Sequence, residues 1–139
     1  MTKYSNPHAR EIRNQVLRGI AGNRTPGLHV PGFFLDLRWH ETAGETTRIS
    51  IADGPHCRDA NGEMDVAALA ILADTALATA TRQLIAPAAR LATIHMQIQF
   101  TGTPATGEIS AEAKLLGFGA GASLHQSMTS GTLHANGTP

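Results

Sequence analysis

The run VAALAILADTALATAT, from residue 66 to residue 81, constrains the fold of this chain more than any other feature. Asp65 stands directly before the run, where a carboxylate can accept hydrogen bonds from the free backbone N–H groups of a helix start. We therefore predict a long helix from about Asp65 to Leu84, with Asp65 as its N-cap. Asp74 is a single carboxylate inside this apolar run, and burial of an ionised side chain without a partner is costly. Asp74 must therefore have a compensating partner or face water.

Segments in which apolar and polar residues alternate lie on both sides of the predicted helix. Alternation with a period of two is typical of β-strands that bury one face. The alternating or weakly alternating segments span residues 33–40, 46–53, 91–100, 108–115 and 122–134. The first two are joined by the turn sequence ETAGE and predict a hairpin. The last is followed by ANGT, a turn signal that predicts a return strand beyond it.

The remaining segments are read from their capping and turn residues. Asn6 followed by Pro7 predicts the start of a short leading helix, which ends near Gly19 to Gly22. Residues 23–32 and the loop GPHCRDANGE, residues 54–63, are rich in Pro, Gly and Asn and should be irregular. GFGAGAS, residues 117–123, predicts a flexible joint between strands.

Composition limits the classes of protein to which the chain can belong. Its 139 residues suit one domain, and Lys plus Arg equal Asp plus Glu at 11 each, so no overall charge favours nucleic acid or an anionic membrane as a partner. Cys57 is the only cysteine, and a reducing compartment fits this usage. The seven histidines lack metal-ligand spacing, so we predict no metal site. The N-terminus lacks a secretory signal, and no apolar run approaches about 20 residues, so we expect a soluble, cytoplasmic protein.

The order of predicted elements is two strands, a long Ala-rich helix and at least three further strands. This order predicts an α+β fold in which a curved antiparallel sheet wraps around one long central helix. At LADTA, residues 72–76, the sequence also resembles the hotdog-fold thioesterases, specifically the PaaI-like acyl-CoA thioesterase branch. GEISAEAKLLGFG, residues 107–119, follows in the order typical of that family. The resemblance implies a hotdog domain over residues 33–139, with residues 1–32 forming an N-terminal helix and an irregular lead-in.

The resemblance also implies an activity and an assembly. Proteins of this branch hydrolyse acyl-CoA thioesters to the free acid and CoA, need no resident cofactor, and work as homodimers or homotetramers with active sites between subunits. Asp74 matches the catalytic carboxylate of the family, which acts as nucleophile or as the base that activates water. Such a role would explain a carboxylate on an apolar helix, because a cleft can raise its proton affinity to a useful value.

The sequence departs from the family at the start of the helix. Nine residues before the carboxylate, where the family has His-Gly-Gly, this chain has Asp65, Val66 and Ala67. Val66 adds a branched side chain where Gly would let a backbone N–H approach a carbonyl, and ionised Asp65 would repel an oxyanion unless it is engaged in capping. The resemblance also implies a polar loop residue, which is Asp59 or Asn61 here, and a residue beside the carboxylate, which is Thr75. The implied substrate-binding residues are therefore Asp59, Asn61, Asp65, Val66, Ala67 and Thr75.

Other interpretations of the same residues stay open. The chain could be a hotdog protein that binds an acyl thioester without efficient turnover, or a structural dimer module. Asp74 could face water or make an interfacial hydrogen bond, and Thr75 could bond only to its own helix backbone. His56 could contact substrate, although a surface position is more typical of a loop histidine.

Overall fold

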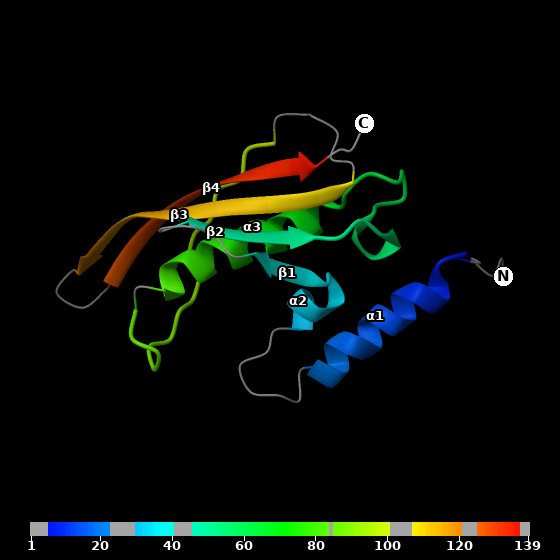
Figure 1. The fold of residues 1–139 in the computed structure, drawn as a ribbon, viewed down its shortest axis with the longest axis horizontal. Helices are drawn as coiled ribbons and strands as arrows, with labels where there is room; N and C mark the ends of the chain where they lie inside the picture. The colour runs from blue at the N-terminus through cyan, green and yellow to red at the C-terminus, as the bar shows by residue number, and fades with distance from the viewer. Residues whose placement is uncertain are drawn as a thin grey trace.

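The computed structural model describes residues 6–22, 30–40, 46–83, 85–100, 107–120 and 125–136. Within these residues three α-helices, one short 3-10 helix and four strands follow one another along the chain (Figure 1). The helical elements are α1 (Ala9–Gly22), α2 (Val30–Phe34), η1 (Pro55–Cys57) and α3 (Val66–Arg82). The strands are β1 (Leu37–His40), β2 (Thr46–Ile51), β3 (Glu108–Ala120) and β4 (His125–Asn136).

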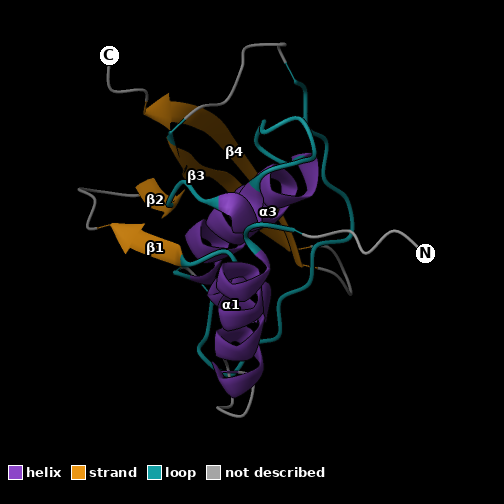
Figure 2. Cartoon of the chain, turned by 90° about the vertical axis from the view of Figure 1, so that its right-hand side faces the viewer, coloured by secondary structure: helices purple, strands orange, loops and turns teal. Residues whose placement is uncertain are grey.

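The four strands form one antiparallel sheet in the order β1-β2-β3-β4. Ile49 of β2 is paired with Ala111 of β3, and Ile51 is paired with Ile109, so their side chains share one face of the sheet. Helix α3 packs against this face (Figure 2). The predicted hairpin, the long helix and the α+β class are confirmed.

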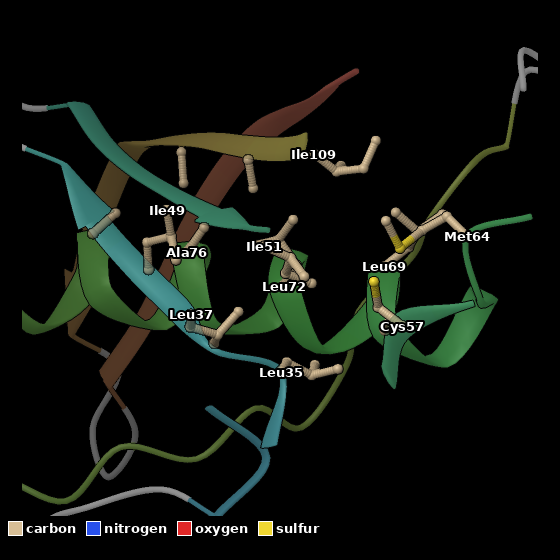
Figure 3. Packing of buried hydrophobic residues seen from close by; sticks show 14 residues of the cluster. Leu35, Leu37, Ile49, Ile51, Cys57, Met64, Leu69, Leu72, Ala76 and Ile109 are labelled. Atoms are coloured by element: carbon tan, nitrogen blue, oxygen red, sulfur yellow. The ribbon is translucent and has the colours of Figure 1, made fainter. Parts of the chain in front are cut away.

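The core lies between the sheet and α3, as Figure 3 shows. Leu72 is fully buried on the helix, opposite Ile49 and Ile51, which are also fully buried. Small residues on the same helix face, Ala76 and Ala80, are buried as well and let the sheet approach the helix closely. The apolar face of α3 therefore explains why the helix packs on the sheet. The predicted capping by Asp65 is also confirmed, because the Ala67 backbone N–H donates a hydrogen bond of 2.7 Å to Asp65 Oδ1.

The first strand begins later than its alternating sequence predicts. Residues 33 and 34 belong to the short helix α2, whose last turn is closed by a hydrogen bond of 2.9 Å from Leu35 N to Pro31 O. Asp36 then adopts a positive φ of 52°, and β1 starts at Leu37. Pro31 is well placed to start a helical turn, because its fixed φ suits the first turn and its missing N–H would have no partner there.

Residues 85–100 contain no strand, although 91–100 alternate clearly in sequence. Ile94 is 88% exposed and Phe100 is 51% exposed, so the predicted buried face is not buried within one chain. A strand needs a neighbour to pair with its backbone groups, and β1 to β4 pair only with one another. The prediction of a strand here is therefore wrong for the single chain.

At the C-terminal end, the predicted last strand is confirmed as β4. The predicted Gly-rich joint is partly wrong, because residues 117–120 extend β3 after a register shift between Leu115 and Gly117. The predicted return strand falls outside the described residues. Among the helices described, none is long and apolar enough to cross a membrane.

Candidate active site

The loop before α3 is held by Asp59. Its Oδ1 accepts hydrogen bonds from the backbone N–H of Asn61 at 2.8 Å and of Glu63 at 2.9 Å. Gly62 has a φ of 81°, a left-handed conformation that favours glycine and lets the loop turn back on itself. The Glu63 and Asn61 amides favour the ionised form and lower the pKa of Asp59. Asp59 is thus occupied in shaping its own loop, with Asn61 as one of its partners.

The same loop is fixed to the helix start by its backbone, and to the residues after β2 by a second carboxylate. Cys57 O accepts a hydrogen bond of 2.8 Å from Asp65 N, and Arg58 Nε donates one of 2.8 Å to Asp53 Oδ1. The Cys57 thiol is buried, and this burial raises its pKa. A buried thiol with a raised pKa makes a poor nucleophile, so Cys57 has a structural role in the loop.

The N-terminus of α3 carries three of the predicted substrate-binding residues, Asp65, Val66 and Ala67. Asp65 Oδ1 accepts the Ala67 N–H, and Asp65 O accepts the Leu69 N–H at 3.1 Å. Val66 is 60% exposed at the first helical position. The Ala67 amide points at a carboxylate of its own chain, and an oxyanion that used this amide would have to displace that carboxylate.

Asp74 lies on the other face of α3 from the core. It follows Leu72 by two residues, a rotation of about 200° around the helix axis, and its side chain is half-buried. Thr93 Oγ1 donates a hydrogen bond of 2.6 Å to Asp74 Oδ1. Thr75, the expected neighbour, instead donates at 2.7 Å to Ile71 O of its own helix. Thr93, and not Thr75, orients the carboxylate.

Thr93 was not among the predicted site residues. The alternation of residues 91–100 places it on the polar side of a predicted strand, but nothing in its local sequence pairs it with a residue 19 positions earlier. The predicted residues fall into two groups. The first group lies around the start of α3 and consists of Asp59, Asn61, Asp65, Val66 and Ala67. The second group, Asp74 and Thr75, lies more than two turns after the start of the helix.

His56 is a second residue whose environment differs from the one expected. Neither of its ring nitrogens is exposed or hydrogen-bonded, and its ring meets Phe34 edge to face at 6.3 Å between centroids. A Cβ atom added to Gly54 would lie 2.7 Å from His56 Nδ1, so the ring requires glycine at residue 54. The ring nitrogens of His56 are therefore enclosed by the loop, although the residue as a whole remains partly exposed.

A groove of about 700 Å³ lies beside the start of α1 and is lined by residues that include His8, Arg58 and Asp59. Its charged groups are already satisfied, since Arg58 pairs with Asp53 and Asp59 accepts backbone amides. The groove is also not lined by Asp74. Within the described part of the chain, no cluster of three or more His, Cys, Asp or Glu side chains could hold a metal ion.

Solved structures resemble this arrangement of one long helix on an antiparallel sheet. A protein from Bacillus halodurans, crystallised with CoA, matches over 98% of this chain and 88% of its own, with a TM-score of 0.77 and 14% identity. A phenylacetic acid degradation-related protein from Ralstonia eutropha JMP134 matches over 96% and 92%, with a TM-score of 0.66 and 15% identity. The chain has the hotdog fold.

A eukaryotic structure has the same architecture. The zebrafish thioesterase superfamily member 2 matches over 91% of this hotdog chain and 89% of its own, with a TM-score of 0.58 and 18% identity. No protein-family model matches the chain, and no curated protein matches it in sequence.

Proposed function

We propose that this hotdog protein hydrolyses an acyl-CoA thioester, with Asp74 as the base that activates water. The observation that carries the proposal is the half-buried carboxylate on the outer face of α3, fixed by Thr93 at 2.6 Å. This hydrogen bond uses Oδ1, and Asp74 Oδ2 has no partner within the described residues. A carboxylate held in one orientation, with one oxygen that no described residue hydrogen-bonds, suits general-base catalysis.

The proposed chemical step is the following. Asp74 takes a proton from a water molecule, whose oxygen attacks the thioester carbon. The tetrahedral intermediate then collapses, the C–S bond breaks, and the CoA sulfur leaves and takes up a proton. Support for CoA as the carrier comes from the Bacillus halodurans structure, which was determined with CoA.

A complete site of this kind requires two copies of the chain. The Ala67 amide at the start of α3 and Asp74 are seven residues apart, which separates them by about 10 Å along the helix axis. One thioester carbonyl cannot contact both ends of that distance, so we propose that one copy supplies the amides and another supplies Asp74. Residues 91–100, which pair with no described strand and expose Ile94 and Phe100, are the proposed contact between copies in a homodimer or homotetramer. Sedimentation velocity at micromolar concentration should show no stable monomer.

A second candidate function has one specific observation in its favour. The Ala67 amide already donates its hydrogen bond to Asp65, and the exposed side chain of Val66 lies at the helix start. Both features weaken the stabilisation of an oxyanion there. A hotdog protein with this helix start could bind an acyl thioester without efficient turnover.

Replacement of Asp74 by Asn separates these possibilities. Asp74→Asn keeps the size of the side chain and an oxygen for Thr93 but cannot take a proton, so single-turnover hydrolysis of acyl-CoA should be abolished. Binding of the CoA ester and the melting temperature should change little. Hydrolysis retained together with a lowered melting point would reject the catalytic role, and saturable binding without hydrolysis by the unmodified protein would favour the second function. A panel of aryl and aliphatic acyl-CoAs serves as substrate.

A further inference from the structure

Helix α1 presents an exposed face that the proposed reaction does not use. Three aliphatic side chains remain exposed on this helix, Val16 at 41%, Leu17 at 54% and Ile20 at 52%. Arg10 and Arg13 are exposed as well, whereas Arg18 donates a hydrogen bond of 3.3 Å to Gln15 Oε1. We call the five side chains of Arg10, Arg13, Val16, Leu17 and Ile20 the α1 face.

The position of α1 leaves this face open. The helix contacts α2 and η1, and it lies beyond β1 at one edge of the molecule, away from β3 and β4 (Figures 1 and 2). Gln15 and Gly19 are buried, so they mark the side that packs on the protein. The aliphatic and arginine side chains of the α1 face point elsewhere.

The charge of the chain is unevenly distributed. Residues 1–24 contain five Lys and Arg against the single acid Glu11, a net charge of +4. The remaining residues contain six Lys and Arg against ten Asp and Glu, a net charge of −4. The expectation of no membrane partner was based on the overall balance, which conceals this difference between the two parts. A local positive potential attracts anions even where the whole molecule is neutral.

Three kinds of partner could cover such a helix. Nucleic acid would use the arginines but would leave the aliphatic side chains between them in water. Pairing of α1 with α1 of a second copy would cover the aliphatic side chains but would bring like charges together. An anionic bilayer satisfies both, because the headgroups pair with arginine while the aliphatic side chains enter the boundary with the acyl chains.

We propose that the α1 face docks the protein onto a bilayer surface rich in anionic lipid. The 14-residue helix lies parallel to the membrane plane, with Val16, Leu17 and Ile20 inserted between lipid headgroups. The arginines extend to the phosphates, since their long side chains can bury the methylene groups and keep the guanidinium at the interface. This docking is independent of the proposed hydrolysis and needs no residue of that site.

The test is co-sedimentation of the full chain with vesicles of phosphatidylcholine alone and with 30% phosphatidylglycerol. We expect binding only to the anionic vesicles, with loss of binding at 500 mM salt, because exposed charges are screened. Arg10→Gln with Arg13→Gln should weaken binding at least tenfold, and Arg10→Lys with Arg13→Lys should retain it. Leu17→Ser keeps the charge and should weaken binding severalfold.

Arg90→Gln and Leu116→Ser are matched controls, since both residues are exposed and lie outside α1, and they should bind like the unmodified protein. Four results would overturn the proposal. These are no preference for anionic vesicles, equal losses with the control variants, an unchanged affinity of Leu17→Ser, or self-association at low salt that depends on Arg10 and Arg13 and occurs without vesicle binding. Melting temperatures of all variants confirm that each one is folded.

Discussion

Removal of the Asp65 side chain should lower the stability of this protein and raise its rate of hydrolysis. Asp65 Oδ1 accepts the Ala67 N–H at 2.7 Å, the single side-chain cap on α3. Replacement of an N-cap Asp by Ala typically costs about 1 kcal/mol, which corresponds to a melting temperature lower by roughly 3 to 5 °C in a chain of this length. The same change frees the Ala67 amide and removes a negative charge from the place where an oxyanion would bind. Because one oxyanion donor is worth about 10²- to 10³-fold in turnover, we expect Asp65→Ala to raise the rate by at least about tenfold.

The assay pairs single-turnover hydrolysis of acyl-CoA with thermal unfolding of the same samples. Asp59→Ala is the matched control, because Asp59 also accepts backbone amides in this loop but caps no helix. It should lose stability with no gain in rate. Asp65→Asn keeps a capping oxygen but removes the charge, so its melting temperature should stay close to that of the unmodified protein and its rate should lie between those of the unmodified protein and Asp65→Ala. A rate for Asp65→Ala that is unchanged or reduced, in a folded protein, would refute the argument that this cap limits hydrolysis.

Two further changes test the other contacts of the site. Thr93→Val keeps the shape of the side chain but removes the hydroxyl that holds Asp74, so turnover should fall about tenfold or more with little change in KM, whereas Thr75→Val should leave turnover nearly unchanged. Because the folded-state pKa of Asp59 lies below its unfolded value, its ionised form stabilises the fold above about pH 4, and this contribution disappears as the pH falls through the folded-state pKa. Melting temperatures from pH 7 to pH 3 should therefore fall less steeply for Asp59→Asn, and parallel curves would contradict this.

The elements that the sequence predicts correctly are those whose causes lie close together in the chain. Asp65 and the apolar run behind it define α3 within a few residues, and the alternation of residues 46–53 defines β2. The start of β1 is different, because Pro31 favours a helical turn over residues that alternate like a strand. Residues 91–100 fail as a predicted strand for a different reason. Their pattern is that of a strand, but a strand also requires a partner, and no local pattern specifies one.

In the candidate site too, some features follow from the local sequence and others depend on the folded chain. Asp74 can be found from sequence, because a single acid in an apolar helix requires an explanation, and the cap at Asp65 follows from its position. The bond between Thr93 and Asp74 depends on how residues 85–100 return along α3, which is a property of the folded chain. Asp59 fits the polar loop position by its place in the sequence. Its carboxylate nevertheless accepts hydrogen bonds from the backbone amides of Asn61 and Glu63, because a short Asp side chain reaches the amides that follow it in the loop.

The position of Asp74 explains how an apolar helix can tolerate a carboxylate. Leu72 and Ala76, on either side of it in sequence, point into the core and are almost fully buried, so α3 gains its packing from one face. Asp74 is on the other face, half-buried and bonded to Thr93, where its charge is partly solvated and the cost of desolvation is reduced. Because the sheet packs on one face of α3, the opposite face can carry Asp74, the proposed base. Substitutions in the core should lower the stability of the fold, whereas substitutions at Asp74 should lower the rate of acyl-CoA hydrolysis.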